Sequence, residues 1–212
     1  MMNAVIFDLD GVLVHTDDLH FQAWGAIAKN LGITFTAADN DRLRGVSRME
    51  SLDILLSLGE NHVTEVEKAA LATAKNDIYV SLLASLGPDD VDPVVRDTLT
   101  QLKNRGVALA IGSSSKNARA ILRQVELIDE FDAISDGTDI THSKPDPEVF
   151  LHAAAALGLP PAQCLIVEDA HAGVNAAIAG GFAAAGIGDA ASHPGVAYSI
   201  NSLRELLDLI PA

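Results

Sequence analysis

Cysteine is almost missing from this chain of 212 residues, which contains only Cys164. A lone cysteine forms neither an internal disulfide nor a cysteine-rich metal site, and it fits a reducing compartment. The sequence also lacks an apolar run of the roughly 18 residues that span a membrane. No basic segment followed by a hydrophobic stretch marks its first residues. We therefore expect a cytoplasmic protein with no membrane partner.

Basic residues are also scarce in this chain. The chain has 14 lysines and arginines against 29 aspartates and glutamates, which gives a formal net charge of −15. Such a charge repels the phosphates of nucleic acids, so we expect no nucleic-acid partner. Hydrophobic residues make up 49% of the sequence, which is enough for a substantial core. The length suits one domain, or one domain with a smaller insert.

Five short apolar runs, mostly flanked by glycine or polar residues, indicate strands that are buried on both faces. They cover residues 4–7, 107–112, 132–135, 164–167 and 183–188. Helical patterns lie between the later runs: one extends from Pro93 to Gly106 and another from Pro147 to Gly158. This alternation of strands and helices predicts an α/β fold with a doubly wound, Rossmann-like parallel sheet.

A long helical interval interrupts this alternation. Its helical patterns cover residues 17–32, 47–59 and 64–87. Thr64 and Glu67 match a capping box at the start of the last one. We therefore predict a core domain built from residues 1–14 and 92–212, with residues 15–91 as an inserted helical module.

Polar side chains follow four of the predicted strands, at the sheet edge where ligands bind in open α/β folds. They are Asp8 and Asp10, Ser113–Ser115, Lys144, and Glu168 with Asp169. Four carboxylates close together repel one another unless a cation neutralises them. Mg²⁺, a hard ion that prefers oxygen ligands, suits such a set.

The same side chains have the parts that phosphoryl transfer requires. Lys144 and the Ser113 hydroxyl can hold a phosphoryl group while Asp8 attacks its phosphorus and becomes an aspartyl phosphate. Asp10 can protonate a leaving oxygen or deprotonate an incoming hydroxyl. Taken singly, each pattern also has a structural interpretation: a surface turn, a solvated loop lysine, a serine run that caps a helix. Their coincidence at successive strand ends favours the catalytic interpretation.

Four segments resemble the signature segments of the haloacid dehalogenase superfamily: FDLDGVLVHT, GSSSKN, SKPDPEVF and VEDAHAGVNAAIAGG. The insert at 15–91 resembles the helical cap domain of that superfamily. The resemblance implies that Asp8 is the nucleophile and Asp10 the acid/base, while Ser113 and Lys144 bind the transferring phosphoryl group. It also implies one Mg²⁺ ion per chain, with the ligands Asp8, Asp10 (through its carbonyl), Glu168 and Asp169.

Within this superfamily, the segments HFQAWGAIAKNLGI, LRGVSRMESL, AKNDIYV and SSSKN resemble the β-phosphoglucomutase branch. That branch interconverts β-D-glucose 1-phosphate and D-glucose 6-phosphate through an aspartyl phosphate, with β-glucose 1,6-bisphosphate as intermediate and activator. The resemblance implies sugar phosphates as the partners of this chain, which we expect to be a monomer. The implied substrate-binding residues are Thr16, His20, Trp24, Gly45, Val46, Arg48, Lys75, Ser114, Ser115, Lys116 and Asn117.

Three cap residues have the most specific implied roles. Arg48 offers a fork-shaped cation to the phosphate that lies far from the nucleophile. His20 and Lys75 resemble residues that couple closure of the cap to Asp10, and closure would exclude water from the phosphorylated enzyme. Structural interpretations stay open: His20 and Trp24 can be one side of a packed helix, Arg48 a surface cation, and Lys75 a side chain whose stem packs on an apolar helix.

Two residues depart from the mutase pattern. His15 stands next to the hinge, where that branch has an acidic residue, and its role is not predicted. Ser114 replaces a small apolar residue and adds a hydroxyl near the phosphoryl site. The alternative function is a sugar-phosphate phosphatase of the same fold. A phospho-accepting receiver module also has aspartates at strand ends, but it needs no insert like 15–91, which argues against that role.

Overall fold

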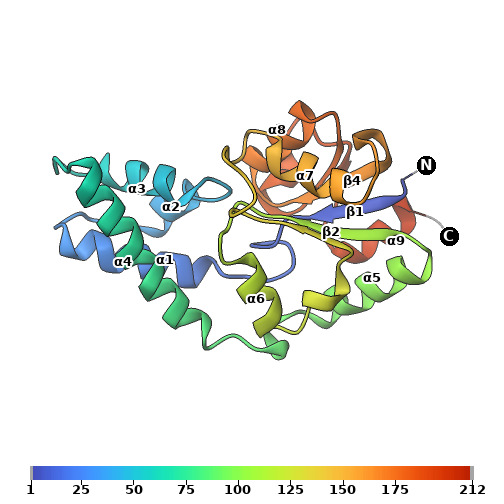
Figure 1. Cartoon of the computed structure of the whole chain (residues 1–212), viewed down its shortest axis with the longest axis horizontal. Coiled ribbons are helices and arrows are strands. Elements are labelled where there is room, and N and C mark those ends of the chain that lie inside the picture. Colours follow the sequence, from blue (N-terminus) through green and yellow to red (C-terminus); the bar gives the residue numbers. More distant parts are fainter. Residues whose placement is uncertain (1, 211–212) are drawn as a thin grey trace.

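The computed structural model describes residues 2–210 of the chain (Figure 1). Within them a sheet of six parallel strands has the order β3-β2-β1-β4-β5-β6. The strands are β1 Ala4–Phe7, β2 Ala108–Gly112, β3 Ala133–Ser135, β4 Cys164–Glu168, β5 Ala183–Gly186 and β6 Tyr198–Ser199. The predicted doubly wound parallel sheet is confirmed, and its winding reverses between β1 and β4.

Helices cover both faces of the sheet, as Figure 1 shows. One face carries α5 Pro93–Asn104, α6 Ala118–Gln124 and α9 Leu206–Leu209, and the other carries α7 Glu148–Ala156 and α8 His171–Ala179. Val5 and Phe7 of β1 belong to the first hydrophobic cluster, whereas Ala4 and Ile6 belong to the second. Because alternate side chains of a strand point to opposite faces, a wholly apolar β1 is buried on both sides.

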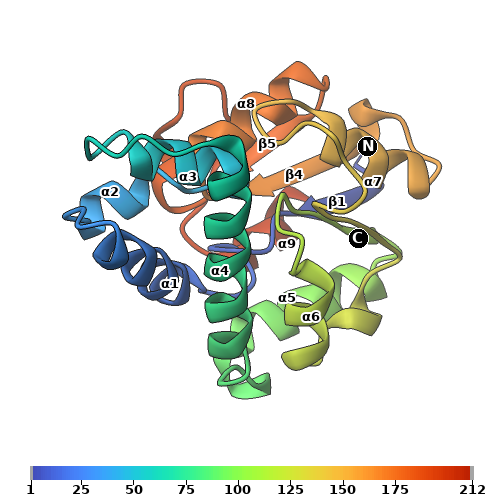
Figure 2. The same cartoon turned by 60° about the vertical axis from the view of Figure 1, so that its left-hand side comes forward.

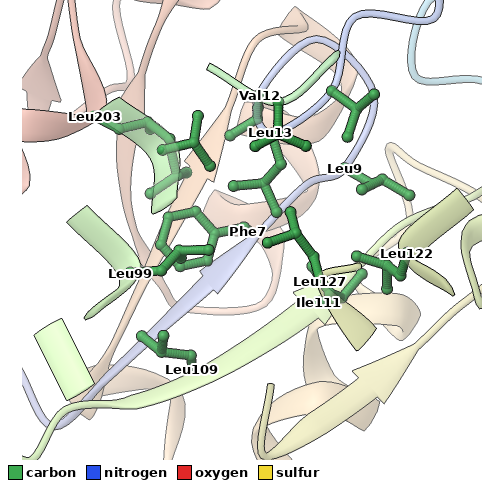
Figure 3. Close-up of a cluster of buried hydrophobic side chains, with 14 of the residues drawn as sticks. Phe7, Leu9, Val12, Leu13, Leu99, Leu109, Ile111, Leu122, Leu127 and Leu203 are labelled. Carbon is green, nitrogen blue, oxygen red and sulfur yellow. The ribbon is translucent and has the colours of Figure 1, made fainter. Parts of the chain in front are cut away.

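The packing around Phe7 fixes the end of β1 from which the first aspartate projects. Figure 3 shows Phe7 among Leu99, Leu109 and Ile111, all of which are buried. Burial of a side chain of this size contributes roughly 1.5–3 kcal/mol. The residue after Phe7 is therefore held by a rigid strand rather than by a mobile loop.

A helical module lies beside the sheet. Its helix α4 runs along the side of the module that faces α6 (Figure 2). Its helices are α1 Asp17–Asn30, α2 Ala37–Asp41, α3 Arg48–Leu56 and α4 Glu65–Leu83. They enclose a hydrophobic cluster of their own, which includes Trp24, Leu52 and Leu55. The predicted capping box of Thr64 and Glu67 is present at the start of α4. The exact division of the chain into 1–14 with 92–212 and 15–91 stays a prediction.

Short elements account for most differences from the prediction. Helices α2 and α9 and strand β6 were not predicted, and the run at 183–188 forms a strand only up to Gly186. Single turns of 3₁₀-helix occur as η1 Pro88–Asp90, η2 Ile128–Glu130, η3 Pro161–Gln163, η4 Gly188–Ser192 and η5 Leu203–Glu205. None of the helices in the described part of the chain is both long and apolar enough to cross a membrane.

Candidate active site

Four segments of the chain converge on one edge of the sheet, at the switch point between β1 and β4. Asp8 follows β1, Ser113 follows β2, and Glu168 is the last residue of β4. Lys144 comes from the loop between β3 and α7, is fully buried, and donates from Nζ to Asp8 Oδ1 at 2.5 Å and to Glu168 Oε1. The structure thus brings together residues that are separated by up to 160 positions (168 − 8) in the sequence.

The charges at this edge depend on one another. Burial raises the pKa of Asp8 well above its ordinary value; Lys144 opposes the shift, and Glu168, Asp169 and Asp10 add to it. Burial alone would lower the pKa of Lys144, but the carboxylates of Asp8 and Glu168 outweigh it and raise that pKa. Lys144 is therefore a permanent cation next to Asp8, which suits a group that binds a phosphoryl oxygen.

Asp10 lies in a different environment, although only one residue separates it from Asp8. Thr16 Oγ1 donates a hydrogen bond to Asp10 Oδ1, and Thr16 is fully buried. Burial raises the pKa of Asp10, and the hydrogen bond from Thr16 opposes the shift. A carboxyl group with a raised pKa gains and loses a proton nearer neutral pH, as a general acid/base requires.

Oxygen donors suited to a divalent cation gather beside Asp8. The Asp169 carboxylate approaches the loop after β1 because Gly11 has no side chain: a Cβ at Gly11 would lie 2.1 Å from Asp169 Oδ2. Burial, together with the charge of Glu168, raises the pKa of Asp169 to about 7, as expected of a carboxylate surrounded by other carboxylates. Asp8, Asp169 and the Asp10 carbonyl therefore fit the oxygen chemistry of Mg²⁺.

Glu168 fits a metal less directly. Its Oε1 accepts from Lys144 and its Oε2 accepts from the Ala170 N–H at 3.0 Å. Among residues 2–210, no three Asp, Glu, His or Cys side chains are grouped closely enough to hold a metal ion, and Lys144 Nζ occupies the space between Asp8 and Glu168. The ligand role of Glu168 stays a prediction.

A cavity of about 600 Å³ lies over this edge, between the sheet and the helical module. Most of the predicted site residues line it: Asp8, Asp10, His20, Trp24, Gly45, Val46, Arg48, Lys75, Ser113, Ser114, Ser115, Lys116, Asn117, Lys144 and Asp169. Thr16 and Glu168 are predicted site residues that do not line the cavity. Thr16 acts on Asp10 from behind, and Glu168 acts on Lys144.

Cations line the part of the cavity that the helical module provides. Lys75 Nζ on α4 lies 2.9 Å from His20 Nδ1 and above the ring of Tyr79, 4.3 Å from its centroid. Burial lowers the pKa of Lys75 to about 7, and the charge of Arg48 adds to the shift. Burial also lowers the pKa of His20 well below its ordinary value, with Lys75 and Arg48 contributing. A neutral His20 can therefore accept the hydrogen bond from Lys75.

The serine loop after β2 is ordered by its own hydrogen bonds. The Ser115 N–H donates to Ser113 Oγ at 3.1 Å, and the Asn117 N–H donates to Ser115 Oγ at 3.2 Å. Asn117 Nδ2 donates to Asn76 Oδ1 of α4 at 3.0 Å, which joins the sheet part of the chain to the helical module. Ser114 Oγ is buried and has no hydrogen-bond partner among the described residues.

Comparison with known proteins identifies the family. The family model described as haloacid dehalogenase-like hydrolase matches residues 2–181, which is most of the chain. This chain belongs to the haloacid dehalogenase-like hydrolase family. The strand-end aspartates and the buried lysine described above thus lie in an enzyme of that family.

Relatives within the haloacid dehalogenase-like family include mutases and phosphatases. The β-phosphoglucomutase of Bacillus subtilis is 46% identical over 189 residues, which cover 88% of this chain and 84% of that protein. A phosphorylated carbohydrates phosphatase of Thermotoga maritima is 31% identical and covers 98% of this chain and 91% of its own length. The crystal structure of β-phosphoglucomutase from Clostridium difficile matches with a TM-score of 0.91 at 35% identity and covers 97% of this chain and 93% of that one.

Several residues that shape this haloacid dehalogenase-like site were not predicted. Gly11 and Gly173 leave room for carboxylates: a Cβ at Gly173 would lie 1.8 Å from Glu168 Oε1. The glycines next to the acidic motifs were a signal for such close approach. Arg44 and Tyr79 lie within the segments LRGVSRMESL and AKNDIYV, but no role was predicted for either residue. His15 is exposed, and no hydrogen bond or ion pair of its side chain occurs within residues 2–210.

Proposed function

We propose that this enzyme is a β-phosphoglucomutase, which interconverts β-D-glucose 1-phosphate and D-glucose 6-phosphate. One observation carries the proposal: a single cavity extends from Asp8 and Lys144 at the sheet edge to Arg48 and Lys75 on the helical module. A sugar bisphosphate needs a cationic group at each end, and this cavity supplies both. The 46% identity to the β-phosphoglucomutase of Bacillus subtilis supports the same activity.

In the proposed reaction, Asp8 carries the phosphoryl group. Asp10 takes the proton from the C6 hydroxyl of β-glucose 1-phosphate as that oxygen attacks the phosphorus, and the Asp8–phosphorus bond breaks. The product, β-glucose 1,6-bisphosphate, then binds turned end for end. Asp8 attacks the C1 phosphate, Asp10 returns its proton to the leaving C1 oxygen, and glucose 6-phosphate is released.

The other groups position and shield these steps. Lys144 and Ser113 hold the transferring phosphoryl group, while Arg48 holds the remote phosphate. Mg²⁺ bound by Asp8, Asp169 and the Asp10 carbonyl would supply neutralisation of phosphate charge. Closure of the helical module over the cavity would exclude water, so that a sugar hydroxyl rather than water accepts the phosphoryl group. The predictions of a monomer, of a cytoplasmic location and of the bisphosphate as activator belong to this proposal.

A sugar-phosphate phosphatase is the second candidate, because phosphatases of Thermotoga maritima and Escherichia coli are 31% and 30% identical to this chain. The test is an incubation with β-glucose 1-phosphate, Mg²⁺ and a trace of the bisphosphate, in which glucose 6-phosphate and free phosphate are followed together. We expect glucose 6-phosphate as the main product. Free phosphate as the main product would reject the mutase in favour of the phosphatase.

The variant Arg48→Ala tests the role of the remote phosphate in the same assay. We expect it to lower mutase turnover strongly while slow hydrolysis of a small phosphate ester, which has no second phosphate, is retained. An equal loss of both activities would remove Arg48 from that role.

A further inference from the structure

Arg44 lies between α2 and α3, and its guanidinium meets acidic side chains from three segments. Its Nη2 is 3.2 Å from Asp17 Oδ2 at the start of α1 and 3.5 Å from Asp41 Oδ1 at the end of α2. Its Nη1 is 3.8 Å from Asp189 Oδ2 in η4. The first two acids belong to the helical module, whereas Asp189 belongs to the sheet part. Arg44 therefore bridges the two parts of the chain.

The backbone beside Arg44 touches the sheet part directly. A Cβ placed on Gly45 would lie 3.2 Å from Ala170 Cβ and 3.5 Å from Ala172 Cβ, at the start of α8. Gly45 is followed by Val46, and both line the 600 Å³ cavity. The substrate loop, which we define as residues 44–48, thus rests on α8 at the point where Arg44 reaches Asp189.

The residue that Arg44 reaches is itself held in place. The Asp189 carbonyl accepts from Ser192 Oγ at 2.9 Å and lies 3.2 Å from His171 Nε2. The next residue, Ala190, donates from its N–H to the Asp169 carbonyl at 3.0 Å. The backbone at Asp189 is thus fixed on the sheet part, and the carboxylate that it carries faces a cation on the helical module.

Carboxylates face one another across this boundary. A second cavity of about 390 Å³ is lined by Asp41 from the module and by Asp169 and Asp189 from the sheet part, with His171 beside them. Arg44 is the one lysine or arginine that lines this cavity within the described part of the chain. Without its charge, like charges on the two sides would repel each other and favour separation of the module from the sheet.

We propose that Arg44 is a positioning residue that holds the substrate loop against α8 through a reversible ion pair with Asp189. Its pairs with Asp17 and Asp41 stay within the module when the cavity opens, so only the pair with Asp189 must break. The Asp189 side chain is 73% exposed, and exposed ion pairs are weak and sensitive to salt. Such a contact can form and break in each catalytic cycle. In the reaction proposed above, it would keep water from the phosphorylated Asp8.

A cysteine introduced beneath the substrate loop can report how often the loop leaves α8, by a labelling rate that does not depend on enzyme activity. Ala172→Cys places a thiol beside Gly45, and Cys164→Ala removes the native, buried thiol. In this background, N-ethylmaleimide should label the introduced thiol roughly two- to fivefold faster when Asp189→Asn or Arg44→Gln is added, since an exposed ion pair changes an equilibrium by about that factor. Arg44→Lys should keep most of the protection, and about 0.5 M NaCl should bring the parent to the rate of Asp189→Asn.

Lys103→Gln is the matched control, because it removes an ion pair of similar exposure that lies away from the helical module. This pair joins Lys103 Nζ of α5 to Glu130 Oε2 of η2 at 2.9 Å. It should leave the labelling rate unchanged. Equal labelling rates with and without Asp189→Asn would overturn the proposal. So would an increase of the same size with Lys103→Gln.

Kinetics in the cysteine-free background connect the bridge to the reaction. Asp189→Asn should raise KM for β-glucose 1-phosphate about two- to fivefold and increase the ratio of free phosphate to glucose 6-phosphate, and Asp189→Glu should restore both. A change in labelling alongside an unaltered KM and product ratio would overturn the positioning role. If the wild type forms only phosphate, the mutase proposal fails, whereas the labelling result still decides whether the bridge exists.

Discussion

The hydroxyl of Thr16 donates the only hydrogen bond that the Asp10 side chain receives from the described residues. Thr16 is fully buried and does not line the cavity, so its effect on a reaction would act through Asp10. A carboxyl group that must both take and give a proton needs a fixed direction as well as a suitable pKa. Thr16 therefore orients the Asp10 carboxyl group without itself touching the substrate.

We expect Thr16→Val to lower kcat by about tenfold to a hundredfold with little change in KM, because it removes the donor without changing the volume of the side chain. Thr16→Ser keeps the hydroxyl and should retain most of the activity. Steady-state kinetics of both variants check this. Similar losses in the two variants, or a change confined to KM, would contradict the assigned role.

Lys75 predicts a pH dependence of stability. Burial lowers its pKa from 10.5 in the unfolded chain to about 7 in the folded one, and Arg48 adds to the shift. Between these two values the unfolded chain binds more protons, so stability rises with pH. Below pH 7 both states are protonated, and the full destabilising effect is present. The side chain is 3% exposed, so solvent screens this effect little.

The wild type should therefore gain about 3 kcal/mol more than Lys75→Met between pH 6 and pH 9, since each unit of pH above 7 contributes about 1.4 kcal/mol. Urea unfolding of both proteins at pH 6, 7.5 and 9 measures the difference. Lys68→Met removes a half-buried lysine on the same helix whose hydrogen bond to Asp53 raises its pKa, so it should give the same pH dependence as the wild type. Parallel curves for the wild type and Lys75→Met would show that Lys75 stays charged.

Three of the site residues that the sequence predicted share one property. Asp8, Ser113 and Asp169 stand directly after apolar strands, and parallel strands bring such positions to one edge whatever the details of packing. Arg44 has no such anchor. Its partner Asp189 lies in a distant turn, and their approach depends on how the helical module docks on the sheet, which no local pattern encodes.

At the scale of elements, the substrate loop depends on close approach of backbone to α8. Gly45 has φ +74 and Ala170 Cβ near the position of a missing side chain, whereas Gly32 at the end of α1 has φ +70 and open space around it. The two glycines share the backbone conformation but not the contact. Substitutions at the two glycines therefore separate the effect of backbone strain, which both would cause, from displacement of the loop, which only a substitution at Gly45 would cause.

Both Gly45→Ala and Gly32→Ala should lower the free energy of unfolding by about 1–2 kcal/mol, because L-residues disfavour positive φ. Only Gly45→Ala should also raise KM, by about tenfold, since its methyl group pushes the loop away from α8. Urea unfolding and steady-state kinetics of the pair make the comparison. A raised KM in Gly32→Ala, or an unchanged one in Gly45→Ala, would contradict this account.

The sequence predicted the long, buried elements and missed the short, exposed ones. Strands β1, β2 and β4 are four or five residues long and wholly or almost wholly buried, so their apolar runs were visible in the sequence. Strand β6 has two exposed residues, Tyr198 and Ser199, and pairs with β5 only after the sheet exists. Helix α2 contains three acidic or amide side chains in five residues, which hides any apolar face.

At the scale of the whole molecule, a few of the chain's many acidic residues lie where a negative charge is least favourable. The formal net charge is −15, yet Asp8, Glu168 and Asp169 are buried together at the sheet edge with Lys144 as their cation. A fold that excludes water from these carboxylates is destabilised unless further positive charge enters. Binding of a divalent cation should therefore stabilise the folded protein more than general screening does.

We expect MgCl₂ at about ten times its dissociation constant to raise the free energy of unfolding by about 1.4 kcal/mol and Tm by about 3–5 °C, relative to NaCl of equal ionic strength. The NaCl reference removes the effect of screening on the surface charge, so the difference reports the buried carboxylates alone. Asp169→Asn removes one of the oxygen anions and should abolish the difference, whereas Asp129→Asn, which changes a distant acid in η2, should preserve it. Thermal unfolding in the two salts, with EDTA to reverse the MgCl₂ effect, measures all three proteins. The same increase in MgCl₂ and NaCl would mean that the sheet edge binds no divalent ion, and an increase that survives in Asp169→Asn would place the ion elsewhere.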